Sequence, residues 1–145
     1  MINRLVQAHH ADYKEDLPFW ESWTKGNDPV LELGCGHGRV TIPLARAGRQ
    51  IVGVDLDLDS IRFLQSELDG ENKDLQERLS IVQADILQYQ GDHIFGSIII
   101  PCNTYSIFSV TERKLLLGNA ARMLNQEGLF IVSVPNPHWI QALHE

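Results

Sequence analysis

The feature that most constrains this chain is an apolar stretch that ends in three alternating glycines. Residues 30–33 read Val-Leu-Glu-Leu, and residues 34–38 continue as Gly-Cys-Gly-His-Gly. This pattern predicts a buried strand followed by a sharp turn, because only glycine visits positive φ freely. A second apolar strand, residues 50–54, leads directly into an acid, Asp55. Strand, glycine turn, helix, strand and acid, in this order, are typical of a nucleotide-binding α/β sheet.

The spacing of the glycines distinguishes dinucleotide-binding folds from other nucleotide-binding folds. Dinucleotide-binding folds use G-x-G-x-x-G, in which the last glycine lets the helix and the strand pack closely. Here the spacing is G-x-G-x-G, and Arg39 stands where that last glycine would fall. Glu32, two residues before the first glycine, would repel a pyrophosphate but suits a ligand with an amino group. The loop therefore predicts a cofactor with a positive end and no phosphates.

The glycine loop, Asp55 and two later segments together resemble the class I S-adenosylmethionine-dependent methyltransferases. The later segments are residues 83–86, Gln-Ala-Asp-Ile, and residues 98–104, Ile-Ile-Ile-Pro-Cys-Asn-Thr. Residues 30–45 are similar to the small-molecule branch of that superfamily. The resemblance covers about residues 12–137. It implies a Rossmann-like parallel sheet, an S-adenosylmethionine cofactor with S-adenosylhomocysteine as product, and methyl transfer to a small molecule by in-line displacement.

The resemblance also implies roles for individual residues. Asp55 would accept both ribose hydroxyls, Asp85 would hold the adenine amino group, and Leu56 and Ile86 would cover the adenine ring. Asn103 would position substrate or cofactor, and no general base is visible in the sequence. Structural alternatives stay open, since glycines can serve turn geometry alone and aspartates can cap turns. The predicted cofactor-binding residues are Tyr13, Glu32, Gly34, Cys35, Gly36, Gly38, Asp55, Leu56, Asp85, Ile86, Pro101 and Asn103.

Alternating strand-like and helix-like segments predict one α/β domain over residues 1–145, with a helical segment at 1–28 and the sheet at 29–145. The alternation implies a parallel sheet with right-handed crossovers, and the resemblance implies the strand order 3-2-1-4-5, counted along the chain. The ligand crevice would lie at the carboxyl ends of the strands, where that order switches. Strands are predicted at about 29–33, 50–55, 79–83, 94–100 and 129–134. Helices are predicted at about 12–24, 38–47, from a cap at Asp57 through Leu68, and from a cap at Thr111 to Leu124, with a polar loop at 70–78.

Two departures from the family pattern are visible. Many of these methyltransferases carry an acid in the fourth strand, often after Phe, where this chain has Gly96. The family's sheet also has seven strands, the last two forming a hairpin, whereas this chain reaches Glu145 about eleven residues after its fifth predicted strand. Residues 129–134 would then be an apolar edge, paired with a second copy or covered by the segment around Trp139 and Ile140. The chain is either a methyltransferase or a non-catalytic S-adenosylmethionine-binding module or remnant that needs a partner.

Composition narrows the expected partners. The net charge of −7 argues against a dedicated nucleic-acid binder, which needs a basic face. No apolar run approaches the ~20 residues of a membrane helix, and the first ten residues hold no signal-peptide core. Cys35 and Cys102 are too few for a disulfide framework, and the histidines show no metal-ligand spacing. We expect a cytoplasmic protein that binds a small molecule and no metal, nucleic acid or membrane, and that can self-associate through its fifth strand.

Overall fold

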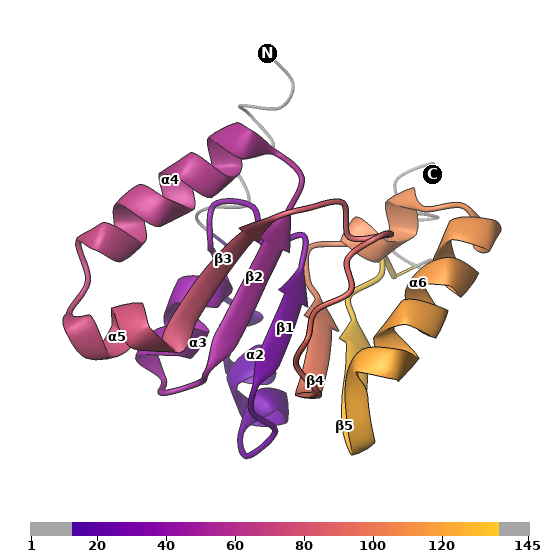
Figure 1. Cartoon of the computed structure of the whole chain (residues 1–145), viewed down its shortest axis with the longest axis horizontal. Coiled ribbons are helices and arrows are strands. Elements are labelled where there is room, and N and C mark those ends of the chain that lie inside the picture. Colours follow the sequence, from indigo (N-terminus) through magenta and orange to yellow (C-terminus); the bar gives the residue numbers. More distant parts are fainter. Residues whose placement is uncertain (1–12, 137–145) are drawn as a thin grey trace.

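A five-stranded parallel sheet forms the centre of the computed structural model, which describes residues 13–136 (Figure 1). The order across the sheet is β3-β2-β1-β4-β5, and every neighbouring pair is parallel. The predicted fold class and strand order are confirmed. The order reverses between β1 and β4, so a crevice for a ligand is expected at the carboxyl ends of these strands. The strands are β1 Val30–Leu33, β2 Ile51–Asp55, β3 Leu79–Gln83, β4 Phe95–Ile100 and β5 Leu124–Val132.

Two apolar clusters, one on each face of the sheet, make up the core. Alternate residues of a strand point to opposite faces, so Val30 and Leu31 of β1 belong to different clusters. All six residues of β4 are buried, as expected of a strand covered on both sides. The first cluster includes residues of α2 (Leu17–Thr24), α3 (Thr41–Arg46), α4 (Leu58–Asp69) and α5 (Lys73–Arg78), and the second includes residues of α6 (Val110–Met123).

Three helices begin elsewhere than predicted. The helix expected at about 12–24 begins at Leu17, with Asp16 at its N-cap and Pro18 in its first turn. The helix expected from residue 38 begins only at Thr41, because Gly38 has a φ of 85°, which cannot continue a helix. The N-cap of α6 is Ser109 and not Thr111. Ser109 accepts the Glu112 backbone N–H, and the Glu112 carboxylate accepts that of Ser109, so the pair forms a capping box. The capping role predicted for Asp57 is confirmed by its hydrogen bond from the backbone N–H of Ser60, at 2.9 Å.

The polar stretch predicted as a loop at residues 70–78 contains a helix, α5. The Asn72 side chain accepts the backbone N–H of Leu75 at 3.0 Å and caps its first turn. Leu75 is the one fully buried residue of this helix, so the amphipathic signal was too short to show in the sequence.

The last strand begins earlier than predicted, at Leu124, and ends at Val132. It pairs with β4 through a register irregularity near Phe95, so the turn expected at Gly128 lies within the strand. In the described sheet β5 is an edge, and residues 128–133 are half-buried. The segment around Trp139 and Ile140 lies outside the described residues. Association through β5 stays a prediction.

Gly96 in β4 has a steric reason to be glycine. A Cβ at this position would overlap the Asn27 carbonyl, because the segment between α2 and β1 crosses the start of β4. The backbone N–H of Gly96 donates to the Pro29 carbonyl at 2.9 Å, and the Ser97 hydroxyl donates to the Asn27 carbonyl at 3.2 Å. The position at which the methyltransferase pattern often has an acid is therefore closed to any side chain here. Among residues 13–136, no helix combines the length and the apolar composition that crossing a membrane requires.

We expect Gly96→Ala to lower the free energy of unfolding by about 1–3 kcal/mol, because the new methyl group meets backbone that cannot rotate away. Gly118→Ala is the matched control, since the nearest atom to its new Cβ is Nη1 of Arg122 at 4.0 Å in helix α6. That control should raise the same free energy by about 0.5–1 kcal/mol. Urea unfolding followed by circular dichroism measures both. Equal midpoints for the two variants would contradict this account of Gly96.

Candidate functional site

The loop after β1 turns through three glycines with left-handed backbones. The φ angles of Gly34, Gly36 and Gly38 are 81°, 51° and 85°. A Cβ on Gly38 would collide with Leu64 of α4, and one on Gly34 would lie 3.0 Å from Cγ2 of Thr104. A Cβ on Gly36 would meet nothing within 4 Å. Two of the glycines thus allow close packing, while the middle one faces open space where a ligand can approach the backbone.

Asp55 fastens this loop to the end of β2. Its Oδ2 accepts the backbone N–H of Gly36 at 2.8 Å, and its Oδ1 accepts that of Asp57 at 2.9 Å. The structure therefore brings Asp55 and the glycine loop together, as the sequence predicts. An ionised carboxylate has about four lone-pair sites. Two of these are used by the loop and the turn, which leaves acceptor capacity for a ligand with hydroxyl groups.

Glu32 lies beneath the loop and is 2% exposed. The Thr41 hydroxyl donates to its Oε2 at 2.6 Å. Burial raises the pKa of the carboxyl to about 8, although the Thr41 hydrogen bond and the charge of Arg39 oppose that rise. The carboxyl is therefore mostly neutral at pH 7 and exerts little of the repulsion toward phosphates expected from the sequence. The other argument against a dinucleotide, that Arg39 stands where a glycine is needed, holds whether or not Glu32 is charged.

Arg39 joins three separate parts of the chain. Its guanidinium donates to the Tyr13 carbonyl at 2.7 Å, to both oxygens of Asp16 at 2.5 and 2.8 Å, and to Sγ of Cys102 at 2.9 Å. It also lies over the Tyr13 ring, 5.5 Å from the centroid. Tyr13 itself is half-exposed. The segment before α2, the glycine loop and the loop after β4 are thus held together by one side chain, which in the sequence is visible only as a missing glycine.

The loop after β4 contains two consecutive residues with positive φ, Cys102 at 59° and Asn103 at 60°. Such conformations in residues other than glycine concentrate at functional sites. The Asn103 side-chain oxygen accepts the Ser133 hydroxyl at 3.3 Å. Asn103 is exposed, and within residues 13–136 its amide NH₂ group donates to no protein atom. Pro101, at the end of β4, is buried.

The residues predicted to contact the adenosine lie at or just after the ends of β2 and β3. Asp85 accepts the backbone N–H of Leu87 at 2.9 Å through Oδ1. Leu56 is 65% exposed and free to cover a ligand. Ile86 is buried in the core with Leu33 and other residues, so most of its surface is already covered.

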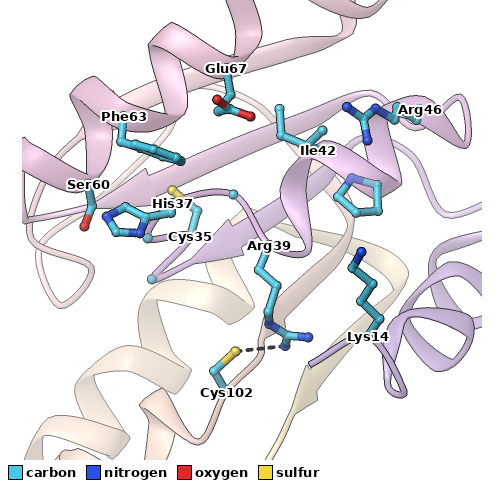
Figure 2. A pocket seen from close by; sticks show the side chains of 14 residues that line it. Lys14, Cys35, His37, Arg39, Ile42, Arg46, Ser60, Phe63, Glu67 and Cys102 are labelled. Atoms are coloured by element: carbon cyan, nitrogen blue, oxygen red, sulfur yellow. Dashed lines mark hydrogen bonds between the residues drawn. The ribbon is translucent and has the colours of Figure 1, made fainter. Parts of the chain in front are cut away.

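A cavity of about 480 Å³ opens on the helix side of the glycine loop (Figure 2). This volume lies in the range of ~300–1,000 Å³ that is usual for small-molecule sites. It does not extend to Asp55, Leu56, Asp85 or Ile86, so the cavity and the predicted adenosine contacts meet only at the glycine loop. Its lining comprises Lys14, Gly34, Cys35, Gly36, His37, Gly38, Arg39, Ile42, Pro43, Arg46, Ser60, Phe63, Glu67 and Cys102.

Several lining residues were not predicted as a site. Phe63 of α4 packs its ring against His37 of the loop, with centroids 4.7 Å apart (Figure 2). A signal for Phe63 exists in the sequence, because it is a large apolar residue outside the Ile61, Leu64 and Leu68 stripe of that helix. The other lining residues that were not predicted show no comparable pattern in the sequence.

Neither cysteine has the properties of a reactive thiol. Cys35 is buried, and burial raises the pKa of its thiol well above the usual range, so the thiol stays protonated. Burial also raises the pKa of Cys102, although the hydrogen bond from Arg39 opposes this. Neither thiol therefore has the lowered pKa of a reactive cysteine.

We expect Glu32 to make the protein less stable as pH rises from about 4.5 toward 8. Its ordinary pKa is 4.5 and its pKa in the folded chain is about 8, so the folded state binds more protons in this window. The contribution is fully present below the lower value and is lost as pH passes the upper one, with a slope of up to ~1.4 kcal/mol per pH unit. Glu32→Gln does not titrate and supplies the reference. The assignment fails if the difference in unfolding free energy between wild type and this variant is flat from about pH 5 to 8.

Comparison with known proteins places the chain among the methyltransferases. A methyltransferase domain family matches residues 30–128. The ubiquinone biosynthesis O-methyltransferase of Bartonella quintana is 29% identical over 136 residues, which cover 94% of this chain and 50% of that protein. The cypemycin N-terminal methyltransferase of a Streptomyces species is 30% identical over 122 residues, covering 80% and 47%. The chain thus spans about half the length of these relatives.

The fold comparison agrees. The glycopeptide N-methyltransferase MtfA, solved in complex with S-adenosylmethionine, superposes with a TM-score of 0.74 at 23% identity, over 83% of this chain and 54% of that one. At this level of identity the superposition shows a shared fold. The family match covers more than half of the chain and includes the glycine loop, Asp55 and the strand ends. This chain is therefore a member of the methyltransferase domain family.

Proposed function

We propose that this chain binds S-adenosylmethionine and transfers the methyl group to a small-molecule acceptor. The observation that carries the proposal is the left-handed glycine loop fastened to Asp55, with open space in front of Gly36, in a member of the methyltransferase family. The ligand of MtfA and the names of the two relatives support the cofactor and the acceptor class. The net charge of −7 supports a small-molecule acceptor over a nucleic acid.

The residues present fit the cofactor. The loop backbone from Gly34 to Gly38 would hold its amino-acid part, and the unused lone pairs of Asp55 would accept the ribose hydroxyls. Asp85 and Leu56 would contact the adenine. When bound, the cofactor supplies a methyl group on a sulfonium, which is a good leaving group.

The chain's own contribution is alignment. Holding an acceptor in line with a methyl group can contribute on the order of 7–11 kcal/mol to the barrier without proton transfer. The left-handed backbone of Asn103 and its hydrogen bond from Ser133 support this residue for the task. Its free amide donors can orient an acceptor oxygen or a carboxylate, but an amide cannot abstract a proton. We therefore assign Asn103 a positioning role.

A second function remains open, namely a non-catalytic S-adenosylmethionine-binding module that acts with a partner. The observations behind it are the glycine loop and its hydrogen bond to Asp55, which would hold the cofactor whether or not an acceptor is methylated. Release of S-adenosylhomocysteine with a panel of amine, hydroxy and carboxy metabolites separates the two functions. Turnover above the acceptor-free rate supports the enzyme, and tight binding with no turnover on any member supports the module. We propose a cytoplasmic location for either.

We expect S-adenosylmethionine or S-adenosylhomocysteine to bind more tightly than NAD. The G-x-G-x-G spacing leaves Arg39 where a dinucleotide fold needs a glycine, and Arg39 is fixed there by Asp16 and Cys102. Isothermal titration calorimetry with each ligand measures the difference. Comparable or tighter binding of NAD would contradict the proposed function.

We expect Asp55→Ala to weaken cofactor binding about ten- to a hundred-fold, since hydrogen bonds to a charged group are worth roughly 1.5–3 kcal/mol. Asp59→Ala is the control, because the Asp59 side chain is 91% exposed in the first turn of α4. Asp55→Asn keeps an acceptor for the Gly36 N–H and separates loss of the ribose contact from loss of the loop anchor. Calorimetry measures all three dissociation constants. Similar values for the Asp55→Ala and Asp59→Ala variants would make Asp55 a purely structural cap.

A further inference from the structure

An ion pair forms part of the wall of the cavity beside the glycine loop. Arg39 lines the cavity, and its side chain is 11% exposed, while that of its partner Asp16 is 21% exposed. The indole N–H of Trp20 donates to Asp16 at 2.8 Å and holds the carboxylate from a second side. Burial raises the pKa of Asp16, but the hydrogen bonds from Arg39 and Trp20 outweigh it and lower the pKa overall. At neutral pH the pair is therefore fully ionised and has no net charge.

The cavity is also lined by Lys14, Arg46 and Glu67, and among the described residues none of these three forms an ion pair with Arg39. Glu32, beneath the same loop, is mostly neutral at pH 7 because burial raises its pKa to about 8. Arg46 lies on another part of the lining (Figure 2). It is paired with Glu71, which does not line the cavity. Among the described residues, Asp16 is the only carboxylate hydrogen-bonded to Arg39. Without its charge, a largely buried guanidinium would stand uncompensated at the cavity.

The two forms of the cofactor differ in one relevant property. S-adenosylmethionine carries a positive sulfonium, whereas S-adenosylhomocysteine has a neutral thioether and is otherwise the same molecule minus one methyl group. An uncompensated cation in the wall repels the first and not the second, while an uncompensated anion attracts the first. Loss of structure in the loop affects both alike. The ratio of the two dissociation constants therefore reports the charge of the wall.

We infer that Asp16 is a specificity-determining residue, whose carboxylate cancels the charge of Arg39 so that the cavity accepts the cationic cofactor and does not favour the demethylated product. This inference rests on the proposed function, because it needs both ligands to bind at the glycine loop, which lines this cavity next to Arg39. It assigns Asp16 and Arg39 a role beyond holding the chain segments together. The ion pair then limits inhibition by the product, because a wall without net charge gives S-adenosylhomocysteine no electrostatic advantage over S-adenosylmethionine.

The test is calorimetry of both ligands at pH 7 with four proteins: wild type, Asp16→Asn, Arg39→Gln and the double variant. Asp16→Asn should raise the ratio of the S-adenosylmethionine to the S-adenosylhomocysteine dissociation constant on the order of ten-fold, from one unscreened charge at a partly buried position. Arg39→Gln should lower it, because Asp16 then stands unpaired. The double variant restores neutrality, so its ratio should return to roughly two-fold of wild type even if both affinities fall.

Two controls separate charge from structure. The exposed Arg62–Asp59 pair, with a closest distance of 3.9 Å, lies outside the cavity lining, and Asp59→Asn combined with Arg62→Gln should leave the ratio unchanged. Arg39→Lys keeps the charge but loses the planar fork, so it should weaken both ligands without changing the ratio.

Each outcome decides a different question. If wild type binds neither ligand, the proposed function fails. If wild type binds both and the single variants change both constants by the same factor, the inference is overturned and the ion pair only holds the fold together. If Asp16→Asn does not fold, as judged by urea unfolding, the Arg39→Gln and double variants decide. An unchanged ratio in Arg39→Gln overturns the inference, and a lowered ratio that the double variant reverses supports it.

Discussion

The chain that leaves β1 passes so close to α4 that a side chain would collide there, and this steric constraint organises the rest of the molecule. Gly38 lies against Leu64 of α4, where no side chain fits, and its backbone has positive φ. The turn delays the start of α3 until Thr41. It also leaves the backbone N–H of Gly36 facing Asp55, so that the ends of β1 and β2 are joined by a hydrogen bond. The polar strand ends and the cavity both follow from the path of this loop.

Most of the sheet could be predicted from the sequence, because buried parallel strands are short apolar runs with clear ends. The strand at Leu79–Gln83 has the predicted bounds. Helix α5 was missed because its sequence, Lys-Asp-Leu-Gln-Glu-Arg, is polar and depends on one buried leucine and the Asn72 cap. The start of β5 was also missed, since residues 125–127 are exposed and polar and join the strand only through pairing with β4.

The site could be predicted where its residues follow strand ends, because such positions meet at one edge of a parallel sheet. The glycine loop and Asp55 are of this kind. The contacts of Arg39 could not be predicted, since Asp16 and Cys102 are far from it in the sequence and no motif links them. The charge state of Glu32 could not be predicted from the sequence either. A motif shows that a carboxyl is present, but only the folded structure shows that it is buried against Thr41.

The position of β1 between β2 and β4 has a consequence for the order in which the chain folds. β1 pairs with β2, its next strand along the chain, and also with β4, where Val30 lies beside Ser97. Contacts between distant residues carry the larger loop-closure cost and form late. During synthesis, one side of an apolar strand therefore stays unpaired until β4 has emerged from the ribosome.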